Sequence, residues 1–186
     1  SEFFPVGIEK KYGCAVRVLC PLKECEALLV YDLLYRSGIE VKLVGLKDEI
    51  TSSHNVSFRT DIHIDDFNYQ DYNAIILPGG MPGTLNLEKD PRVNKIIDYF
   101  MENNKLIAAI CAAPSILNHK GLLKQERFTC YPGFECGLKP AKEKAIKEGN
   151  IITGIGLGGE FEFAHLIIKT LLDEERANEV FNKIQY

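Results

Sequence analysis

The sequence has 186 residues, of which 46% are hydrophobic and 26% are charged, and its formal net charge at pH 7 is −4. These values are typical of a single globular domain, and the acidic balance gives no general attraction to nucleic acid or to an anionic membrane. No hydrophobic run approaches the ~20 residues that span a bilayer, so we expect a cytoplasmic protein without a membrane partner. We interpret residues 1–13 as an N-terminal extension or an expression-tag remnant, and residues 14–186 as one domain.

The first half of the chain alternates between strand-like and helix-like segments. Residues 14–20 are rich in β-formers and predict a strand, and residues 23–37 have helical spacing that ends at Gly38. Residues 39–45 predict a second strand. Residues 51–66 are polar with some alternation, which favours a hairpin or an extended excursion at a sheet edge.

The second half continues the alternation. Buried strands are predicted at residues 72–78, 106–110 and 151–155, a strand-like piece at 128–131, and helices at 141–147, 161–172 and 174–183. Asp90 and Pro91 cap and begin a further helix. Strands that alternate with helices in this way predict a three-layer α/β fold with a mostly parallel sheet, whose active crevice lies at the carboxyl ends of the strands.

The segment around Cys111 predicts a strand, an abrupt turn and a helix. Five apolar residues precede the thiol, the small Ala112 and Ala113 follow it, and Pro114 suits the first turn of a helix. A helix N-terminus favours a thiolate and would lower the cysteine pKa by two or three units, worth roughly 3–4 kcal/mol. The alternative interpretation is a small buried apolar residue, since free cysteine often has that role.

Other candidate residues also follow predicted strands. The backbone N–H of Gly80, after Gly79, could form an oxyanion hole with that of Ala112, although a glycine pair can also be a simple tight turn. Residues 156–159 are glycine-rich, but their spacing favours loop packing over phosphate binding. Glu26 follows the first strand, where a solvated helix carboxylate is the ordinary interpretation.

Cysteine and histidine spacing gives no sign of a metal site, a disulfide framework or a cofactor. The six cysteines include no C-x-x-C pair, and we expect them to be reduced. His119 lies eight residues beyond Cys111, roughly 12 Å along a helix axis, which makes it a poor general base for the thiol. We expect surface or core roles for His54, His63 and His165.

From about Ala15 onward the chain resembles the DJ-1/ThiJ/PfpI superfamily, and specifically its DJ-1-like branch. The motifs that carry the resemblance are Glu26 and residues 36–39 (RSGI), 76–80 (ILPGG), 106–114 (LIAAICAAP) and 161–164 (FEFA). The resemblance implies a flavodoxin-like fold, a homodimer and a nucleophile-elbow cysteine at Cys111. It also implies that Glu26 is protonated and donates to the sulfur, because two adjacent anions would repel.

The same resemblance implies that Gly80 and Ala112 supply backbone donors to an anion pocket, with Gly79, Tyr131 and Pro132 supporting it. Tyr131 stands where several DJ-1-like proteins have a histidine. Tyrosine is a weak base and a fair hydrogen-bond donor, so this departure disfavours a Cys-His peptidase mechanism.

Three functions are therefore compatible with the sequence. The first is a glyoxalase or protein deglycase that acts on a small-molecule aldehyde through Cys111 and Glu26. The second is a redox-sensing, stress-protective chaperone-like protein, whose partner is an oxidant that converts Cys111 to a sulfinate. The third and weakest is a PfpI-like peptidase or amide hydrolase.

Overall fold

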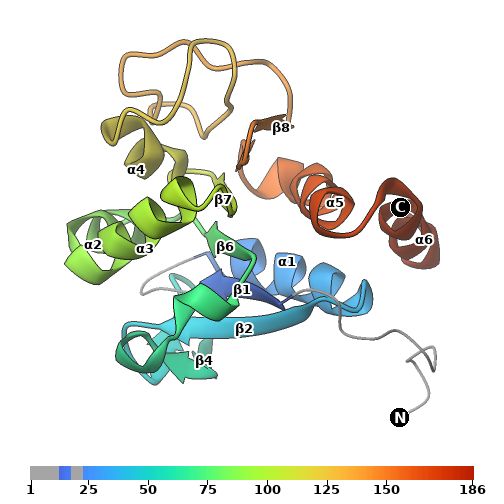
Figure 1. The fold of residues 1–186 in the computed structure, drawn as a ribbon, viewed down its shortest axis with the longest axis horizontal. Coiled ribbons are helices and arrows are strands. Elements are labelled where there is room, and N and C mark those ends of the chain that lie inside the picture. Colours follow the sequence, from blue (N-terminus) through green and yellow to red (C-terminus); the bar gives the residue numbers. More distant parts are fainter. Residues whose placement is uncertain (1–12, 18–22) are drawn as a thin grey trace.

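A seven-stranded sheet forms the middle layer of the structure, a computed structural model that describes residues 13–17 and 23–186 (Figure 1). The strand order is β5-β2-β1-β6-β7-β9-β8. The strands are β1 (Gly13–Arg17), β2 (Glu40–Gly45), β5 (Ile62–His63), β6 (Ala74–Leu77), β7 (Leu106–Ile110), β8 (Ala145–Glu148) and β9 (Ile151–Gly154). All neighbouring pairs in this sheet are parallel except β8 with β9, so the sheet is mostly parallel, as predicted.

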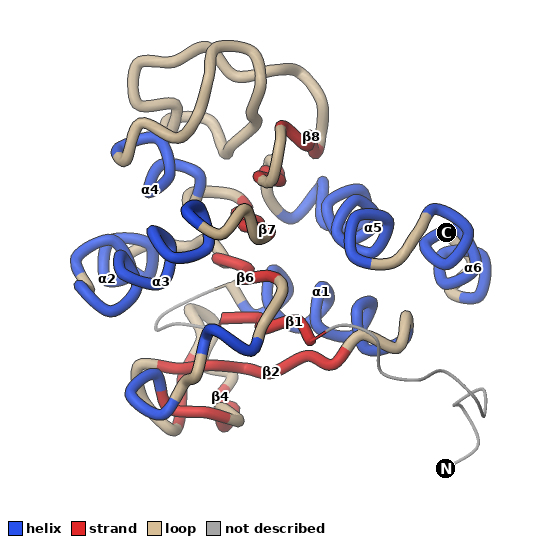
Figure 2. The backbone as a smooth tube through the Cα atoms, in the orientation of Figure 1, coloured by secondary structure: helices blue, strands red, loops and turns tan. Residues whose placement is uncertain are grey.

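Helices cover both faces of the sheet, which gives three layers (Figures 1 and 2). One face is covered by α1 (Glu24–Arg36), α5 (Glu160–Leu171) and α6 (Glu174–Lys183), and the other by α2 (Gly83–Lys89), α3 (Pro91–Glu102) and α4 (Pro114–His119). Short 3₁₀ segments are η1 (Ile64–Asp66), η2 (Tyr69–Asp71) and η3 (Leu157–Gly159). The small antiparallel pair of β3 (Glu49–Thr51) and β4 (Ser57–Arg59) stands apart from the main sheet.

Burial on both faces explains why the central strands have continuous apolar sequences. In β6 and β7, Ile76 and Ala108 belong to the core beneath α1 and α5, whereas Ile75 and Ile107 belong to the core beneath α3 and α4. Since successive strand residues point to opposite faces, a strand with a helical layer on each side is apolar at every position. The predicted strands at 72–78 and 106–110 are confirmed on this basis.

The end of α1 is fixed by a residue from the far end of the chain. Gly38 has φ of 87° and follows the last turn of α1, which confirms the predicted stop. Nε of Arg176 in α6 donates a 2.9 Å hydrogen bond to the carbonyl oxygen of Ser37, across 139 residues of sequence. The two helices are therefore joined at one end of the same layer.

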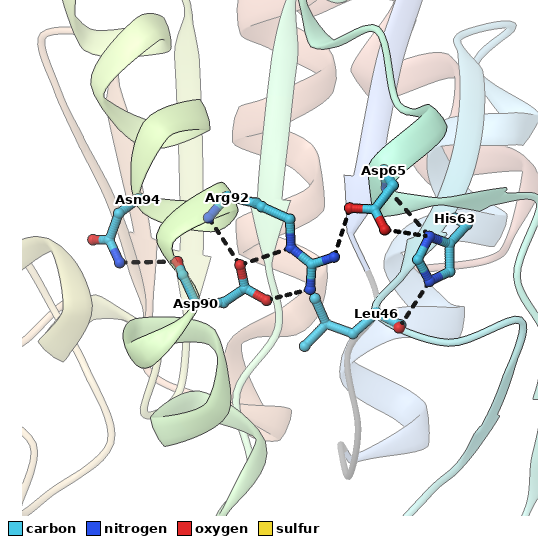
Figure 3. A network of polar contacts seen from close by, with 6 residues as sticks. All are labelled: Leu46, His63, Asp65, Asp90, Arg92 and Asn94. Carbon is cyan, nitrogen blue, oxygen red and sulfur yellow. Dashed lines mark hydrogen bonds and ion pairs between the residues drawn. The ribbon is translucent and has the colours of Figure 1, made fainter.

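A polar network ties α3 to the edge of the sheet (Figure 3). The Asp90 carboxylate accepts from the backbone N–H of Arg92 and so caps α3, as predicted. The Arg92 guanidinium contacts Asp90 and also reaches Asp65 in η1 at 2.7 Å, and its hydrogen bond lowers the pKa of Asp90. His63 donates from Nε2 to the Leu46 carbonyl and accepts the Asp65 N–H at Nδ1, which defines its tautomer.

Two predicted elements are wrong. No strand forms at residues 128–131, which belong to a long loop between α4 and β8, drawn in tan in Figure 2. There the N–H of Thr129 bonds to the Thr153 hydroxyl, and not to a neighbouring strand's backbone. The helix predicted at 141–147 is replaced by β8, which pairs with β9 through a two-residue turn in which Gly149 has φ of 59°.

Other predictions differ from the structure only in extent. The hairpin predicted for residues 51–66 is present as β3–β4 but begins earlier, at Glu49, and the chain then returns to the edge of the main sheet as β5. Helix α2 was not predicted from the sequence. The first predicted strand is present as β1, while its residues 18–20 and the proposed extension at residues 1–12 lie outside the described residues.

Candidate active site

Cys111 lies at the carboxyl end of β7, in a sharp turn before α4. Its backbone has φ of 63°, a conformation that residues other than glycine rarely adopt. Two hydrogen bonds hold it there: its N–H donates to the Gly154 carbonyl at 2.9 Å, and its carbonyl accepts the Tyr131 N–H at 2.8 Å. The predicted strand–turn–helix arrangement is confirmed, and the strained turn is that of a nucleophile elbow.

Gly79 lies directly against this turn. A Cβ at position 79 would lie 2.5 Å from Cβ of Cys111 and 2.8 Å from the Ile110 carbonyl oxygen. Both distances are shorter than van der Waals contact, so the close packing of β6 against the elbow requires glycine. The glycine pair therefore has a steric role at this site, beyond that of a simple turn.

Glu26 is buried beside Cys111, not solvated. Its relative exposure is 2%, and the backbone N–H of Gly79 donates a 3.0 Å hydrogen bond to its Oε2. A further hydrogen bond joins its carboxyl group to the Cys111 thiol. The ordinary interpretation of a surface carboxylate is wrong, because α1 directs the side chain inward, between the ends of β6 and β7.

The electrostatics of the two groups are coupled. Burial raises the pKa of Glu26, and burial together with the charge of Glu26 raises the pKa of Cys111 to about 12. The sequence predicted a lowered cysteine pKa, and that expectation is wrong for a thiol beside a charged Glu26, because burial and this charge outweigh the backbone donors to the sulfur. Both groups cannot ionise together at neutral pH, so the pair keeps one proton.

Two backbone N–H donors lower the pKa of Cys111 and so oppose the effects of burial and of the Glu26 charge. These donors are the N–H groups of Ala112 and Gly80. Gly80 has φ of 99°, a backbone conformation that glycine adopts easily because it has no Cβ. A proton on Glu26 would remove its repulsion and would let the acid donate to the sulfur. The site can therefore hold a thiolate when Glu26 is neutral.

The long loop at residues 120–144 contributes Tyr131 to the rim of the site. A Cβ at Gly156 would lie 3.5 Å from the Tyr131 ring and 3.7 Å from the Cys111 sulfur, so all three residues adjoin one another. Tyr131 is 53% exposed, and the neighbouring Pro132 is also exposed. Sequence reasoning assigned Gly156 only to loop packing, although its place directly after β9 matches that of Gly79 after β6.

A second buried carboxyl group, Glu160, was missed. It is the first residue of α5, it has no exposed surface, and its charge and that of Glu26 interact. Its spacing from Phe163, Ala164 and Ile167 is that of the buried face of α5. The signal in the sequence is an acidic residue at a position whose helical spacing places it on the same face as the core residues of α5.

The histidines make their contacts elsewhere. His119 pairs with Glu88, His54 bonds to Glu24 at 2.6 Å, and His165 bonds to Asn178 at 2.9 Å.

Within the described ranges, no cluster of three or more His, Cys, Asp or Glu side chains could hold a metal ion. Cys25, Cys111, Cys130 and Cys136 are free thiols. Among the helices that the structure describes, none is long and apolar enough to cross a membrane.

Comparison with known proteins identifies the family of the chain. Residues 15–170 match the model of the DJ-1/PfpI family. A Parkinson disease protein 7 homolog from Danio rerio is 33% identical over 85% of this chain and 88% of its own length. The glutathione-independent glyoxalase DJR-1.2 from Caenorhabditis elegans is 29% identical over 87% of this chain and 89% of its own length.

Solved structures give the same result for the fold. The oxidized DJ-1 of Toxoplasma gondii superposes with a TM-score of 0.88 and 28% identity, over 94% of this chain and 98% of the other. The family match, over residues 15–170, covers the elements that carry Glu26, Gly79 and Cys111. The chain belongs to the DJ-1/PfpI family.

Proposed function

We propose that the protein is a cofactor-independent enzyme of the glyoxalase or deglycase type, which converts reactive α-oxoaldehydes to hydroxy acids. Cys111 is the nucleophile and Glu26 is the proton shuttle. The observation that carries this proposal is the buried Glu26 carboxyl group, held by Gly79 beside the Cys111 sulfur. A relative described as a glutathione-independent glyoxalase supports the same assignment.

In the first step the Cys111 thiolate attacks the aldehyde carbon and a C–S bond forms. The electron pair of the carbonyl moves to its oxygen, which takes the proton from Glu26 and yields a hemithioacetal. The N–H groups of Gly80 and Ala112, which face the sulfur, lie where they can stabilise the developing negative charge. Glu26 is left as a carboxylate.

In the second step that carboxylate removes the hydrogen from the former aldehyde carbon as a proton and returns it to the neighbouring carbon, while the hydroxyl proton of the hemithioacetal moves to the neighbouring carbonyl oxygen. One carbon is thereby oxidised and the other reduced, so no external oxidant is needed. The product is a thioester, which water cleaves to a hydroxy acid and the free thiol. Glu26 thus donates a proton in the first step, carries the carbon-bound hydrogen in the second, and regains its own proton when water cleaves the thioester.

Lactate formation from methylglyoxal tests the proposal. We expect Cys111→Ser and Glu26→Ala to abolish the activity. Cys136→Ser is a matched control, because Cys136 is an exposed free thiol outside the site, and it should keep the wild-type rate. Activity that survives both site substitutions at the wild-type rate would contradict the proposal.

A second candidate function is redox sensing linked to stress protection or chaperone-like activity. It is favoured by the partial exposure of Cys111 together with the donors around its sulfur, which would also bind a sulfinate. Mild peroxide should then add two oxygens to Cys111 before it oxidises Cys25, as measured by mass spectrometry. Equal oxidation of both thiols would contradict this function.

The peptidase alternative is weaker, because no histidine among the described residues bonds to Cys111.

We also propose that the protein is a cytoplasmic homodimer. Light scattering coupled to size-exclusion chromatography should give a mass near twice 20.9 kDa. Cell fractionation should place it with cytoplasmic markers. A mass near 20.9 kDa over a tenfold dilution range would contradict the dimer.

A further inference from the structure

Gly156 leaves an open space between the Cys111 sulfur and the ring of Tyr131. A Cβ built at Gly156 would lie 3.7 Å from the sulfur and 3.5 Å from Cδ2 of the ring. Both distances are ordinary van der Waals contacts for a carbon atom. A carbon atom of a bound molecule can therefore occupy this space, with the sulfur on one side and the aromatic ring on the other.

The protein does not fill this space with a side chain at position 156. Gly156 has φ of 139° and ψ of −160°, a backbone conformation that is essentially restricted to glycine. The residue follows the end of β9, and Cys111 follows the end of the neighbouring strand β7. The space thus lies at the carboxyl ends of two paired parallel strands, where α/β sheets bind their ligands.

Hydrogen bonds hold Tyr131 beside the space. Its N–H donates to the Cys111 carbonyl at 2.8 Å, and its carbonyl accepts the N–H of Phe134 at 3.1 Å, which closes a tight turn. The Asn118 side chain donates to the Glu135 carbonyl at 2.7 Å and so ties this turn to α4. The Phe134 ring packs edge-on against the Tyr131 ring, with centroids 6.4 Å apart. Because these contacts position the ring, binding against it costs little ordering of the protein.

The two segments that flank the space present apolar surface. Residues 130–134 and 155–159 contain no charged side chain. Tyr131 is 53% exposed and Leu157 is 62% exposed, although both side chains are large and mainly apolar. Exposed apolar groups that adjoin a reactive group are typical of a binding surface for a ligand of the same character.

The polar groups around the sulfur come from other segments. Glu26 lies on α1, and the N–H donors belong to Gly80, after β6, and to Ala112, before α4. The oxygen atoms of an α-oxoaldehyde bound to Cys111 require these groups. Its carbon substituent requires apolar contact instead, and the space beside Tyr131 offers that contact.

We propose that Tyr131 is a specificity-determining residue: its ring binds the substituent of the α-oxoaldehyde in the space at Gly156 and favours substrates whose substituent is a flat apolar group. The inference rests on the proposed function, because it assigns a place to the substituent of a substrate that Cys111 attacks. Aromatic rings pack favourably against each other, edge-on or offset. Arylglyoxals are therefore the substrate class that this surface fits best.

Turnover of two aldehydes tests the preference. Phenylglyoxal gives mandelate and methylglyoxal gives lactate by the same reaction. In Tyr131→Ala we expect kcat/KM to fall about tenfold for phenylglyoxal and by no more than about threefold for methylglyoxal, because a methyl group covers less of the ring. Tyr131→Phe keeps the ring and should keep the wild-type ratio. Equal losses for both aldehydes in Tyr131→Ala would overturn the inference, as would a ratio in Tyr131→Phe as low as that of the alanine variant.

Alkylation of Cys111 measures the same preference without turnover. Phenacyl chloride and chloroacetone each form a C–S bond and release chloride, and their adducts place a phenyl or a methyl group at the same distance from the sulfur as the two aldehydes do. The ratio of the two rates, followed by mass spectrometry of the Cys111 peptide, should fall about tenfold in Tyr131→Ala. The ratio at Cys25, an exposed free thiol, should not change. An unchanged ratio at Cys111 would overturn the inference.

Two further variants complete the experiment. Tyr186→Ala is the matched control, because it removes an exposed tyrosine ring that stacks on Phe161, and it should keep the wild-type ratios. Tyr131→Leu covers the case in which the alanine variant does not fold. It keeps an apolar side chain without a ring, so its alkylation ratio should fall at least about threefold, and a wild-type ratio would overturn the inference.

The two measurements separate this inference from the proposed function. A chain that forms neither lactate nor mandelate, but whose alkylation ratio falls in Tyr131→Ala, would contradict the proposed enzyme and support the role of Tyr131. Turnover of both aldehydes together with an alkylation ratio that no Tyr131 variant changes would support the enzyme and overturn the inference.

Discussion

The backbone N–H of Gly79 donates to Oε2 of Glu26 at 3.0 Å, and this bond decides which carboxyl oxygen can carry the proton. An oxygen that accepts from an N–H is disfavoured as the site of an acidic hydrogen, so the proton of neutral Glu26 resides on Oε1. The hydrogen bond of the carboxyl group to Cys111 is then available for donation to the sulfur. Gly79 thus both packs against the turn at Cys111 and orients the carboxyl group of Glu26.

Glu26→Gln should separate sulfur activation from proton transfer. The amide oxygen can accept the Gly79 N–H and the amide N–H can donate to the sulfur, while the charge that raises the pKa of Cys111 is removed. We expect alkylation of Cys111 at pH 7 to be at least as fast as in wild type. Lactate formation should fall by about 10²–10⁴-fold, because an amide cannot shuttle a proton.

Glu24→Gln is the control for that variant, since Glu24 lies in the same turn of α1 but bonds to His54. It should leave both rates near wild type. If alkylation and lactate formation fall together in Glu26→Gln, then Glu26 has no separate role in proton transfer.

Gly79→Ala should damage the fold and the site together. The new Cβ would meet Cβ of Cys111 at 2.5 Å and the Ala112 nitrogen at 2.9 Å, and backbone atoms cannot yield as a flexible side chain can. We expect the free energy of unfolding to fall by about 1–3 kcal/mol, with a large loss of Cys111 reactivity. Urea denaturation measures the first effect. Gly158→Ala, where a Cβ meets nothing within 4 Å, should change neither quantity.

Cys111→Gly should be more stable than Cys111→Ala. Both variants remove the thiol, but only alanine keeps a Cβ at φ of 63°, which costs about 1 kcal/mol relative to glycine. Equilibrium unfolding of the two variants measures the strain of the elbow directly. Ala112→Gly is the control, and it should be destabilising, because Ala112 is a buried residue without positive φ. An alanine variant as stable as the glycine variant would show that the elbow carries no strain.

Glu160→Gln should change how stability depends on pH. The folded pKa of Glu160, about 8, lies above its ordinary value of 4.5, so the folded state binds this proton more tightly. The resulting stability is fully present below about pH 4.5 and is lost as pH rises through 8. Glutamine does not titrate. Relative to wild type, the free energy of unfolding of the variant should therefore rise between pH 5 and 9, by an amount on the order of a few kcal/mol.

Thermal melts across this pH range, with Glu162→Gln measured in parallel, provide the check. The Glu162 pKa is lowered, so its control variant should show no such gain at high pH. A constant difference in stability between Glu160→Gln and wild type at every pH would contradict the raised pKa.

Local sequence signals were sufficient for the elements that depend on neighbouring residues. The apolar run before Cys111, the Asp90–Pro91 cap and the stop at Gly38 all involve groups within a few positions of each other. The spacing of residues 141–147 predicts a helix, but pairing with β9 and the turn at Gly149 decide the conformation of β8.

The site itself depends on contacts between distant segments. Glu26 is held by a residue 53 positions away, so its burial could not be seen from its own polar surroundings in the sequence. The pKa of Cys111 likewise follows from enclosure and from Glu26, whereas the helix terminus alone suggested the opposite direction. The family resemblance identified Glu26 and Cys111 as partners, and it gave no signal for Glu160.

The hydrogen bond from Arg176 to Ser37 joins α6 to the end of α1, a helix that is synthesised much earlier. The chain is synthesised from its N-terminus, so α1 leaves the ribosome long before α6 exists. Until then the surface that Ala177, Val180 and Phe181 cover stays open to water. A chain without α6 would expose this apolar face, so the docking of α6 closes the core on the α1–α5 side of the sheet.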